Sequence, residues 1–403
     1  MKKILIFSLS YYPQFTSGAE AAIKEITDRI DPSDIEFHMV TNHYDSTLPK
    51  VEKIGNVLIH RIGITTKNPT FEDLGKLPLH INKPLFQFLA AFKATQLHFK
   101  YKYDGTWAMM AHSSGVPAAI FKLLHPKVPY VLTLQEGDSP EYIEKTMRPL
   151  WPLFTRAFTK ADVIQVISSF LGEWAKRRNF KGPMELISNG ANPKNLYPEY
   201  SQEEVDTLKK TLGKKEGDVY LLNAARLVHQ KANDDVIRAM ALLPENIHFI
   251  LIGAGPDEEM LKEVAKENGV LERVKFIGQL DRNDVPKYRN QTIADIFVCP
   301  SRSEGLGNSF LSAMAARLPV ISTQEGGLSE FIFDKKHNPD KEPTAWVVDK
   351  DNPEQIAEAV RDIINNPDKV KEITETSRAM VFEKYNWDNI AKEMRSKVFG
   401  KIL

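Results

Sequence analysis

The sequence predicts an α/β protein made of two doubly wound domains, each with a parallel sheet. Short apolar runs alternate with helical patterns along almost the whole chain, which is typical of βαβ units. The chain has 403 residues and a hydrophobic content of 42%, which suffices for two cores and exceeds one ordinary domain. A stretch rich in Gly and Pro between Asn189 and Gly217 separates the apolar runs into two sets.

The predicted strands follow one another at regular intervals in both halves of the chain. In the first half they are KILIFSL, EFHMVTN, VLIHRI, WAMMAH, YVLTL, DVIQVIS and MELISNG. In the second half they are VYLLNAAR, IHFILIGAG, VKFIGQL, DIFVCPS, LPVISTQ and AWVVD. We therefore expect one domain over residues 1–192, a linker and hinge region over 193–216, a second domain over 217–384, and a final helix over 385–403.

Charge and cysteine content limit the environment of the protein. Residues 1–192 carry 23 basic and 18 acidic side chains, a balance of +5, whereas the remaining residues carry the opposite balance of −5. The first half is thus expected to meet any anionic surface or acceptor, unless the excess is ordinary surface variation. Cys299 is the only cysteine and fits a reducing compartment. We expect a cytoplasmic protein, at most peripheral to the inner face of a membrane, because no apolar stretch reaches the ~18–20 residues of a span.

The segment from Lys83 to Gly105 departs from the simple alternation. It predicts an amphipathic helix on which several lysines accompany the apolar side chains. Such a helix either covers the first sheet or rests on an anionic membrane face. Its apolar residues are Phe86, Phe88, Leu89, Phe92, Leu97 and Phe99, and the lysines are Lys93, Lys100 and Lys102.

Three strand-to-helix turns have the composition of anion-binding sites. Ser17 and Gly18 follow the first strand and precede a helix, whose N-terminal amides are unpaired donors. Arg226 follows the strand VYLLNAA, and Lys231 lies five residues later, so the two cations are placed to neutralise a pyrophosphate. Each of these features alone is also compatible with an ordinary turn or with solvated surface charges.

The third turn is EGLGNSFLSAMA, which begins at Glu304. Its glycines leave the backbone bare, and the amides from Leu306 through Gly307 and Asn308 to Ser309 are expected to point outward at a helix start. Glu304 is free to accept hydroxyl groups of a sugar. His112 ends another strand and is expected at a sheet edge, either as a substrate ligand or as a structural histidine. No cluster of Cys, His and Asp has metal-ligand spacing, so we expect no metal.

Together and in this order, the motifs resemble those of the retaining glycosyltransferases of family 4, over nearly the whole chain. YYPQFTSGAE is similar to the family's first turn, with Ser17 in place of a glycine, and ARLVHQKA keeps the spacing from Arg226 to Lys231. GAGPDEEML, FIGQL with Gly278 and EGGLSEFI with Gly326 and Gly327 match further family segments. SRSEGLGNSFLSAMA keeps the first of the family's two signature glutamates as Glu304.

Two positions differ from the family pattern. Ser312 stands where the second signature glutamate usually holds the ribose hydroxyls, so a bidentate charged contact would be replaced by one hydrogen bond. Gln135 stands where many members have a histidine, which leaves His112 as the match to the histidine near the reacting centre.

The resemblance implies a GT-B architecture, in which two Rossmann-like domains face each other across a cleft and the final helix crosses back to the first domain. It implies transfer of a hexose from a UDP- or GDP-linked sugar to a saccharide or lipid-linked acceptor, with retained configuration and without metal or other cofactor. The acceptor would bind the first domain and the donor the second, with closure about the hinge near Asn189–Pro198. Cell-surface polysaccharide or glycolipid synthesis is the expected role, with no nucleic-acid partner. The implied catalytic residues are Arg226, Lys231, Glu304 and His112, and the implied donor site comprises Ser17, Gly18, Gly278, Leu306, Gly307, Asn308, Ser312, Gly326 and Gly327.

Two other classes of function share this architecture. A nucleotide-sugar epimerase would bind the same kind of ligand, although the order of the motifs follows the transferases. A non-catalytic relative would keep the fold as an interaction partner, and the changes at Gln135 and Ser312 are in its favour. Retention of Arg226, Lys231 and Glu304 favours the enzyme.

Overall fold

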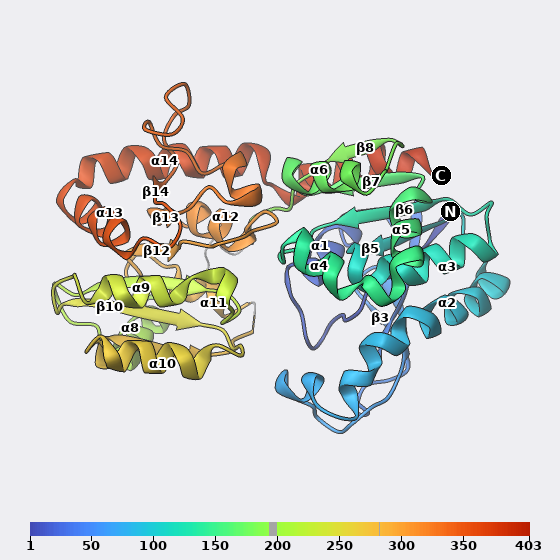
Figure 1. Ribbon diagram of the computed structural model, residues 1–403, viewed down its shortest axis with the longest axis horizontal. Helices are drawn as coiled ribbons and strands as arrows, with labels where there is room; N and C mark the ends of the chain where they lie inside the picture. The colour runs from blue at the N-terminus through green and yellow to red at the C-terminus, as the bar shows by residue number, and fades with distance from the viewer. Residues whose placement is uncertain (193–199, 282) are drawn as a thin grey trace. The chain divides into compact units, whose positions relative to one another are not determined.

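The chain forms two compact units in a computed structural model that describes residues 1–192, 200–281 and 283–403. The first unit comprises Met1–Asn189 and Trp387–Leu403, and the second comprises Gly190–Asn386 (Figure 1). Each unit holds one sheet of mainly parallel strands with helices packed on it, as the alternation of apolar runs and helical patterns predicts. The predicted α/β class with two doubly wound sheets is confirmed.

The sheet of the first unit has eight strands in the order β3-β4-β2-β1-β5-β6-β7-β8, and only β3 runs antiparallel to its neighbour. The strand order turns back at β1, which pairs with both β2 and β5. The carboxyl ends on either side of such a reversal are where open parallel sheets bind ligands. The strands are β1 (Lys2–Phe7), β2 (Ile35–Asn42), β3 (Val51–Ile54), β4 (Val57–Ile62), β5 (Gly105–Met109), β6 (Tyr130–Leu134), β7 (Val163–Val166) and β8 (Met184–Leu186).

Helices cover both faces of this sheet because successive strand residues point to opposite sides. On one face, Ile4 and Ile6 pack with α1 and with the C-terminal segment, whereas Phe7 points the other way and contacts Phe121 of α3 at 6.1 Å between ring centroids. The helices of this unit are α1 (Gly18–Thr27), α2 (Asn82–Tyr101), α3 (Val116–Leu124), α4 (Pro140–Thr146), α5 (Trp151–Thr159), α6 (Ser169–Arg177) and α15 (Trp387–Glu393).

The C-terminal segment completes the core of the first unit. Trp387 is 1% exposed, and Phe399 is fully buried between Phe37 and Trp107, with ring centroids 5.8 and 5.1 Å away. At the surface, Arg395 donates a hydrogen bond of 2.8 Å to Asp34. One face of the first sheet is therefore covered partly by residues from the far end of the chain.

The sheet of the second unit has six parallel strands in the order β11-β10-β9-β12-β13-β14. Its reversal lies at β9, which pairs with both β10 and β12. The strands are β9 (Val219–Ala224), β10 (Ile247–Ile252), β11 (Val274–Gly278), β12 (Ile296–Cys299), β13 (Val320–Ser322) and β14 (Trp346–Val347). The helices are α8 (Gln202–Leu212), α9 (Asn233–Met240), α10 (Glu258–Glu267), α11 (Val285–Tyr288), α12 (Asn308–Ala315), α13 (Pro353–Asn365) and α14 (Pro367–Lys384).

Two details differ from the expected organisation. The linker was expected over residues 193–216, but α8 packs with the second unit, because Val205 and Leu212 are buried and the Leu212 carbonyl accepts a hydrogen bond from Tyr220. Residues 193–199 of that linker lie outside the described part of the chain. The strand β3 has no counterpart among the predicted runs, and the turn at Gly55 joins this short strand to β4.

Replacing Phe399 tests whether the C-terminal segment stabilises the first unit. Phe399→Ala should lower the free energy of unfolding by about 3–5 kcal/mol, because it removes a fully buried ring and leaves a cavity. Denaturant unfolding measures this loss. Lys397→Ala, two residues away and exposed, should leave the unfolding midpoint unchanged. Equal effects of the two substitutions would contradict the proposed packing role.

Candidate active site

The turns after β12 and β13 are packed backbone against backbone at the carboxyl edge of the second sheet. The Gly327 amide donates a hydrogen bond of 3.0 Å to the Glu304 carbonyl. A Cβ on Gly326 would lie 2.1 Å from the Glu304 carbonyl oxygen, and one on Gly327 would lie 2.1 Å from that of Gly305. Gly326 also has φ +62°, which glycine adopts without strain. Glycine is therefore required for the approach that fixes the position of Glu304.

The turns after β9 and β10 meet in the same way. A Cβ on Gly253 would lie 2.0 Å from the carbonyl oxygen of Ala225, and one on Gly255 would lie 2.1 Å from that of Leu227. These two glycines therefore permit close packing of the two turns. Arg226 lies between Ala225 and Leu227, so the packing fixes the backbone from which its side chain extends.

Lys231 and Glu304 form an ion pair at this edge. The Lys231 ammonium contacts Glu304 Oε1, and the two side chains are 14% and 7% exposed. Ser301 donates a weaker hydrogen bond of 3.4 Å to the same carboxylate oxygen. Next to the pair lies Cys299, and burial raises the pKa of its thiol, so it remains neutral beside the charged groups. A cation and a carboxylate are thus held together with little access to water.

Arg302 anchors the turn that carries Glu304. Its guanidinium forms ion pairs with Asp234 and Asp235 of α9 and with Asp351, and its backbone amide donates to the Gln230 carbonyl at 2.8 Å. Burial alone would lower the pKa of Arg302, but its hydrogen bonds to Asp234 and Asp351 raise it above the ordinary value. The arginine thereby links the turns of β9 and β12. Sequence reasoning missed this residue, although it lies two positions before Glu304.

The helix α12 begins directly after this turn. Gly307 precedes it with φ +98°, and Leu306 is buried, so Leu306 can offer a ligand only its backbone. Asn308 is the first helical residue, and its carbonyl accepts a hydrogen bond of 2.9 Å from the Ser312 hydroxyl. Gly278, at the end of β11, has φ +78°, and a Cβ added to it would meet no atom within 4 Å, so close packing does not explain this glycine.

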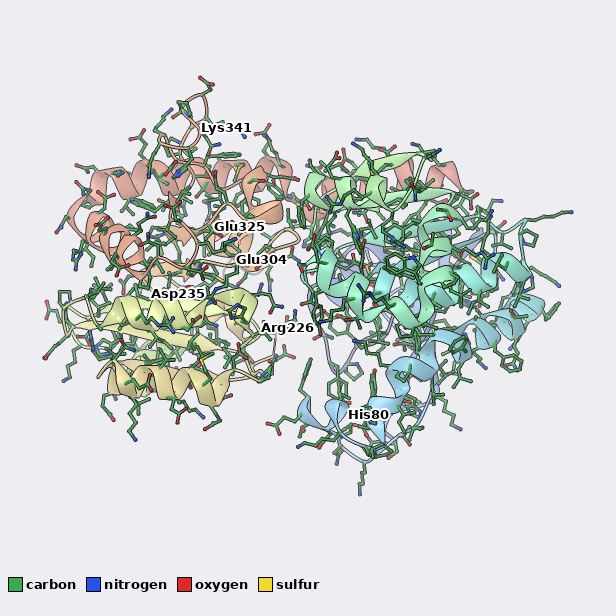
Figure 2. All side chains as sticks on the ribbon, in the orientation of Figure 1. His80, Arg226, Asp235, Glu304, Glu325 and Lys341 are labelled. Atoms are coloured by element: carbon green, nitrogen blue, oxygen red, sulfur yellow. The ribbon has the colours of Figure 1, made fainter. Side chains whose placement is uncertain are left out.

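Ser312 is engaged within the second unit. It is 4% exposed, and its hydroxyl accepts a hydrogen bond of 3.1 Å from the Asn192 amide while it donates to Asn308. The hydroxyl that was expected to replace a ribose-binding glutamate therefore has two partners in the protein. Figure 2 shows Arg226, Glu304 and Glu325 along one side of the second unit.

In the first unit, the turn after β1 is held by a buried carboxylate. Glu20 accepts hydrogen bonds from the Ser17 amide at 2.7 Å and from the Ser10 hydroxyl at 2.8 Å. The Ser17 hydroxyl also bonds to Glu20, and Gly18 begins α1. Ser17 and Gly18 are exposed at the start of a ten-residue helix. The geometry leaves the Gly18 turn accessible to an anion, whereas the Ser17 side chain is occupied by the cap.

His112 lies in a helical turn after β5, next to a carboxylate that sequence reasoning missed. Glu136 follows β6, is 1% exposed, and its Oε1 accepts a hydrogen bond of 2.5 Å from the Ala111 amide. The same oxygen lies 3.7 Å from His112 Nδ1. In the described part of the chain, His112 Nδ1 and Glu136 Oε2 have no hydrogen-bond partner. The neighbouring Gln135, which departs from the family pattern, accepts instead from Asn189 at 2.7 Å.

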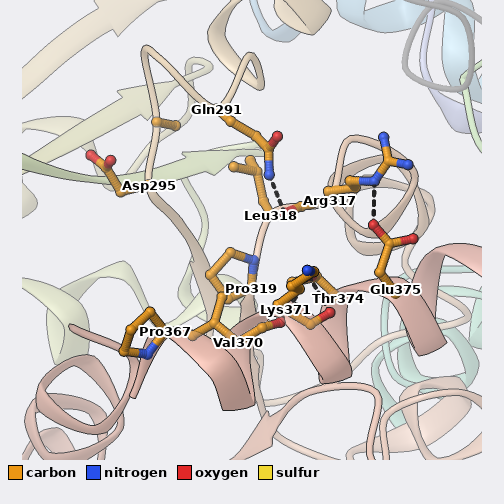
Figure 3. Close-up of a pocket in the computed structure, with 11 residues that line it drawn as sticks. Gln291, Asp295, Arg317, Leu318, Pro319, Pro367, Val370, Lys371, Thr374 and Glu375 are labelled. Carbon is orange, nitrogen blue, oxygen red and sulfur yellow. Dashed lines mark hydrogen bonds and ion pairs between the residues drawn. The ribbon is translucent and has the colours of Figure 1, made fainter. Parts of the chain in front are cut away.

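Other features of the described residues do not form a second site of this kind. No group of three or more His, Cys, Asp or Glu side chains in the described ranges is arranged to hold a metal ion. A pocket of about 280 Å³ lies between Pro319 and the start of α14, and it contains none of the candidate residues (Figure 3). Its rim is tied by an ion pair between Arg317 and Glu375.

Solved structures with the same architecture identify the fold class as GT-B. The chain aligns with the sucrose-phosphate synthase of Thermosynechococcus elongatus with a TM-score of 0.80 and 21% identity, covering 99% of both chains. It aligns with the Anabaena protein HepE, solved in complex with UDP-glucose, with a TM-score of 0.77 and 20% identity, covering 99% of this chain and 100% of that one. Both comparisons concern the fold.

Two family models together span nearly the whole chain. The model described as Glycosyl transferases group 1 matches residues 204–395, and the model described as Glycosyltransferase Family 4 matches residues 16–195. The chain therefore belongs to glycosyltransferase family 4, as the sequence motifs predict, and it is a glycosyltransferase.

Relatives of this chain include proteins with and without an assigned reaction. An uncharacterized glycosyltransferase of Methanocaldococcus jannaschii is 28% identical over 97% of this chain and 96% of its own length. A GDP-mannose-dependent phosphatidylinositol monomannoside mannosyltransferase of Mycobacterium tuberculosis is 27% identical over 59% of this chain and 62% of its own length.

The requirement for glycine beside Glu304 can be tested against a glycine of similar conformation. Gly326→Ala should reduce the rate of sugar transfer by roughly tenfold or more, because the added Cβ displaces the turn that carries Glu304. A displacement of about 1 Å in an active site can lower a rate by about 100-fold. Gly269→Ala is the matched control, because Gly269 has φ +68° and no atom within 4 Å of an added Cβ. Transfer assays and denaturant unfolding of both variants separate the two effects. Equal losses of activity in both variants would attribute the effect to backbone strain alone.

Proposed function

We propose that this glycosyltransferase moves a hexose from a UDP- or GDP-linked sugar to a saccharide or lipid-linked acceptor, with retention of configuration and without a metal ion. The observation that carries the proposal is the enclosed ion pair between Lys231 and Glu304 at the edge where four strand-end turns meet. The cation can neutralise the charge that develops on a departing diphosphate, and the carboxylate can accept hydrogen bonds from sugar hydroxyls. The reactions named for the mannosyltransferase and UDP-glucose bound to HepE support this class of donor.

The proposed roles divide between the leaving group and the sugar. Lys231 and Arg226 neutralise the charge that develops on the diphosphate, and the amides at the start of α12 supply further donors. Glu304 accepts hydrogen bonds from hydroxyls of the hexose, with the Gly326 turn holding its backbone in place. When donor phosphate engages Lys231, it replaces Glu304 as the partner of the ammonium and releases the carboxylate for the sugar.

Retention follows from a displacement on one face of the sugar. The bond from the anomeric carbon to the phosphate oxygen breaks, and the bond to the acceptor oxygen forms on the same face. The acceptor proton passes to the departing phosphate oxygen, so no protein base is needed. His112 is then a substrate ligand and not an obligatory base, and the Glu136 carboxylate lies 3.7 Å from its ring nitrogen.

The same proposal includes the acceptor and the cellular role. We place acceptor binding in the first unit and donor binding in the second, and we propose a role in cell-surface polysaccharide or glycolipid synthesis. The phosphatidylinositol mannoside named for the mycobacterial relative supports a lipid-linked acceptor. No helix in the described ranges is long and apolar enough to cross a membrane.

A panel of labelled UDP- and GDP-sugars tests the reaction class. A transferase releases free nucleotide and forms a product with the donor's anomeric configuration, which NMR reads directly. An epimerase instead returns an epimerised nucleotide sugar, and a non-catalytic relative leaves every donor unchanged. Full activity after chelation of divalent cations is expected. Inverted product, or activity that depends on added metal, would contradict the proposed mechanism.

Substitutions at the ion pair test the assigned roles. Lys231→Met should lower kcat by about 100-fold, because one charge contact to the leaving diphosphate contributes roughly 3 kcal/mol in the transition state. Arg226→Ala and Glu304→Gln should also reduce turnover. Lys262→Met is the matched control, since Lys262 pairs with Glu258 and Glu259 on α10, away from these turns. Steady-state kinetics that leave kcat intact in Lys231→Met would exclude the leaving-group role.

A separate variant tests what Ser312 does. Ser312→Ala should lower the free energy of unfolding by about 1–2 kcal/mol, because the buried Asn192 amide loses its acceptor. Nucleotide affinity, measured calorimetrically with UDP and GDP, should stay within roughly a factor of two. The opposite result, weaker nucleotide binding at unchanged stability, would show that the serine holds the ribose as the family glutamate does.

A further inference from the structure

The outward face of α2 is lined with large apolar side chains. Leu85, Phe88, Leu89, Phe92 and Phe99 recur at helical spacing and are between 36% and 66% exposed. The helix is 20 residues long, which corresponds to about 30 Å. An ordinary covering helix turns its large apolar residues toward the sheet and its polar residues toward water. On α2 large apolar side chains also lie on the exposed face, beside the exposed polar residues Lys83, Gln96 and Lys100.

The buried face of α2 already satisfies its packing on the first unit. Phe86 and Leu97 are buried there together with three alanines, Ala90, Ala91 and Ala94. The small alanines let the helix lie close to its neighbours, so the exposed phenylalanines are not needed for the core. Their presence on the outside calls for another partner.

The apolar face continues onto the end of α3. Leu123 and Leu124 are 47% and 59% exposed, and the next residue, His125, contacts Phe99 of α2 with ring centroids 5.9 Å apart. Figure 1 shows α2 and α3 side by side on the outside of the first unit, in agreement with that contact. We call this area the α2–α3 surface, and it consists of Leu85, Phe88, Leu89, Phe92, Phe99, Leu123 and Leu124.

The segment that forms this surface concentrates positive charge. Residues 74–135 contain seven lysines and a single acid, Asp104, a balance of +6 in a chain whose overall balance is zero. Asp104 is paired with Lys2, and two of the seven lysines, Lys76 and Lys122, are paired with Glu72 and Asp162 outside the segment. Lys102 lies with its ammonium 5.7 Å from the ring centroid of Phe99, beside the apolar stripe. The lysines are Lys76, Lys83, Lys93, Lys100, Lys102, Lys122 and Lys127.

We propose that the α2–α3 surface docks on an anionic lipid bilayer, with its apolar side chains in the interface and its lysines among the headgroups. A bilayer supplies both an apolar layer and negative charge along the length of a helix lying in its plane. A second copy of the chain fits less well, because the same lysine-rich segments would face each other. The proposal rests on this surface and not on the donor chemistry.

Vesicle sedimentation with the full chain tests the docking. At low salt, the protein should bind vesicles containing about 30 mol% phosphatidylglycerol roughly tenfold more tightly than pure phosphatidylcholine vesicles. The double variant Phe88→Gln/Phe92→Gln should lose most of this binding. Its control is Leu242→Gln/Leu271→Gln, which removes two apolar residues of 46% and 37% exposure from the second unit. Lys93→Glu/Lys100→Glu should weaken binding to anionic vesicles, whereas Lys209→Glu/Lys210→Glu on α8 should not.

Two measurements make the result decisive. Nucleotide affinity and unfolding midpoint of the Phe88→Gln/Phe92→Gln variant should equal those of the wild type, so that loss of vesicle binding reports the surface alone. Absence of wild-type binding to anionic vesicles, or binding that the surface variants leave unchanged, would overturn the proposal. Sedimentation showing a dimer that dissociates in the phenylalanine variant would also overturn it and assign the surface to self-association.

Discussion

The second unit depends on direct backbone contact between neighbouring strand-end turns. At Gly253, Gly255, Gly326 and Gly327, any side chain would occupy the space of a carbonyl group in the adjoining turn. These contacts join the turns in two pairs, that of β9 with that of β10 and that of β12 with that of β13. The two pairs are linked where the Arg302 amide bonds to the Gln230 carbonyl and Lys231 pairs with Glu304, so that residues far apart in sequence converge at one edge of the sheet.

Much of this architecture can be predicted from the sequence because buried parallel strands are continuous apolar runs. The thirteen runs identified in the sequence all correspond to strands of the two sheets. The strand β3 was not predicted because Glu52 and Lys53 separate its two apolar residues, and it pairs only at an edge. The packing of α8 on the second unit was not predicted, because the helix is rich in charged residues and only Val205 and Leu212 are buried.

The candidate site was predictable where chemistry follows a motif and not where it depends on burial. Lys231 and Glu304 are marked by their motifs, but their contact arises from turn packing across 73 residues. Glu136 has no distinguishing spacing, and its significance comes from burial beside His112. Ser312 shows the reverse case, since the sequence identifies a departure from the family whereas the structure gives its hydroxyl two protein partners.

The sequence of α2 allows two interpretations, a helix that covers the first sheet and a helix that rests on an anionic membrane face. The two interpretations are compatible with each other. The alanines of α2 pack on the first unit, and Phe88, Phe92 and Phe99 point outward, so covering the sheet and presenting an apolar surface are functions of opposite faces. Residues 74–135 carry a balance of +6, whereas the other residues of the first unit together carry only +1. An anionic surface attracts the first group most strongly, so the charge distribution favours an orientation of the first unit with α2 nearest to such a surface.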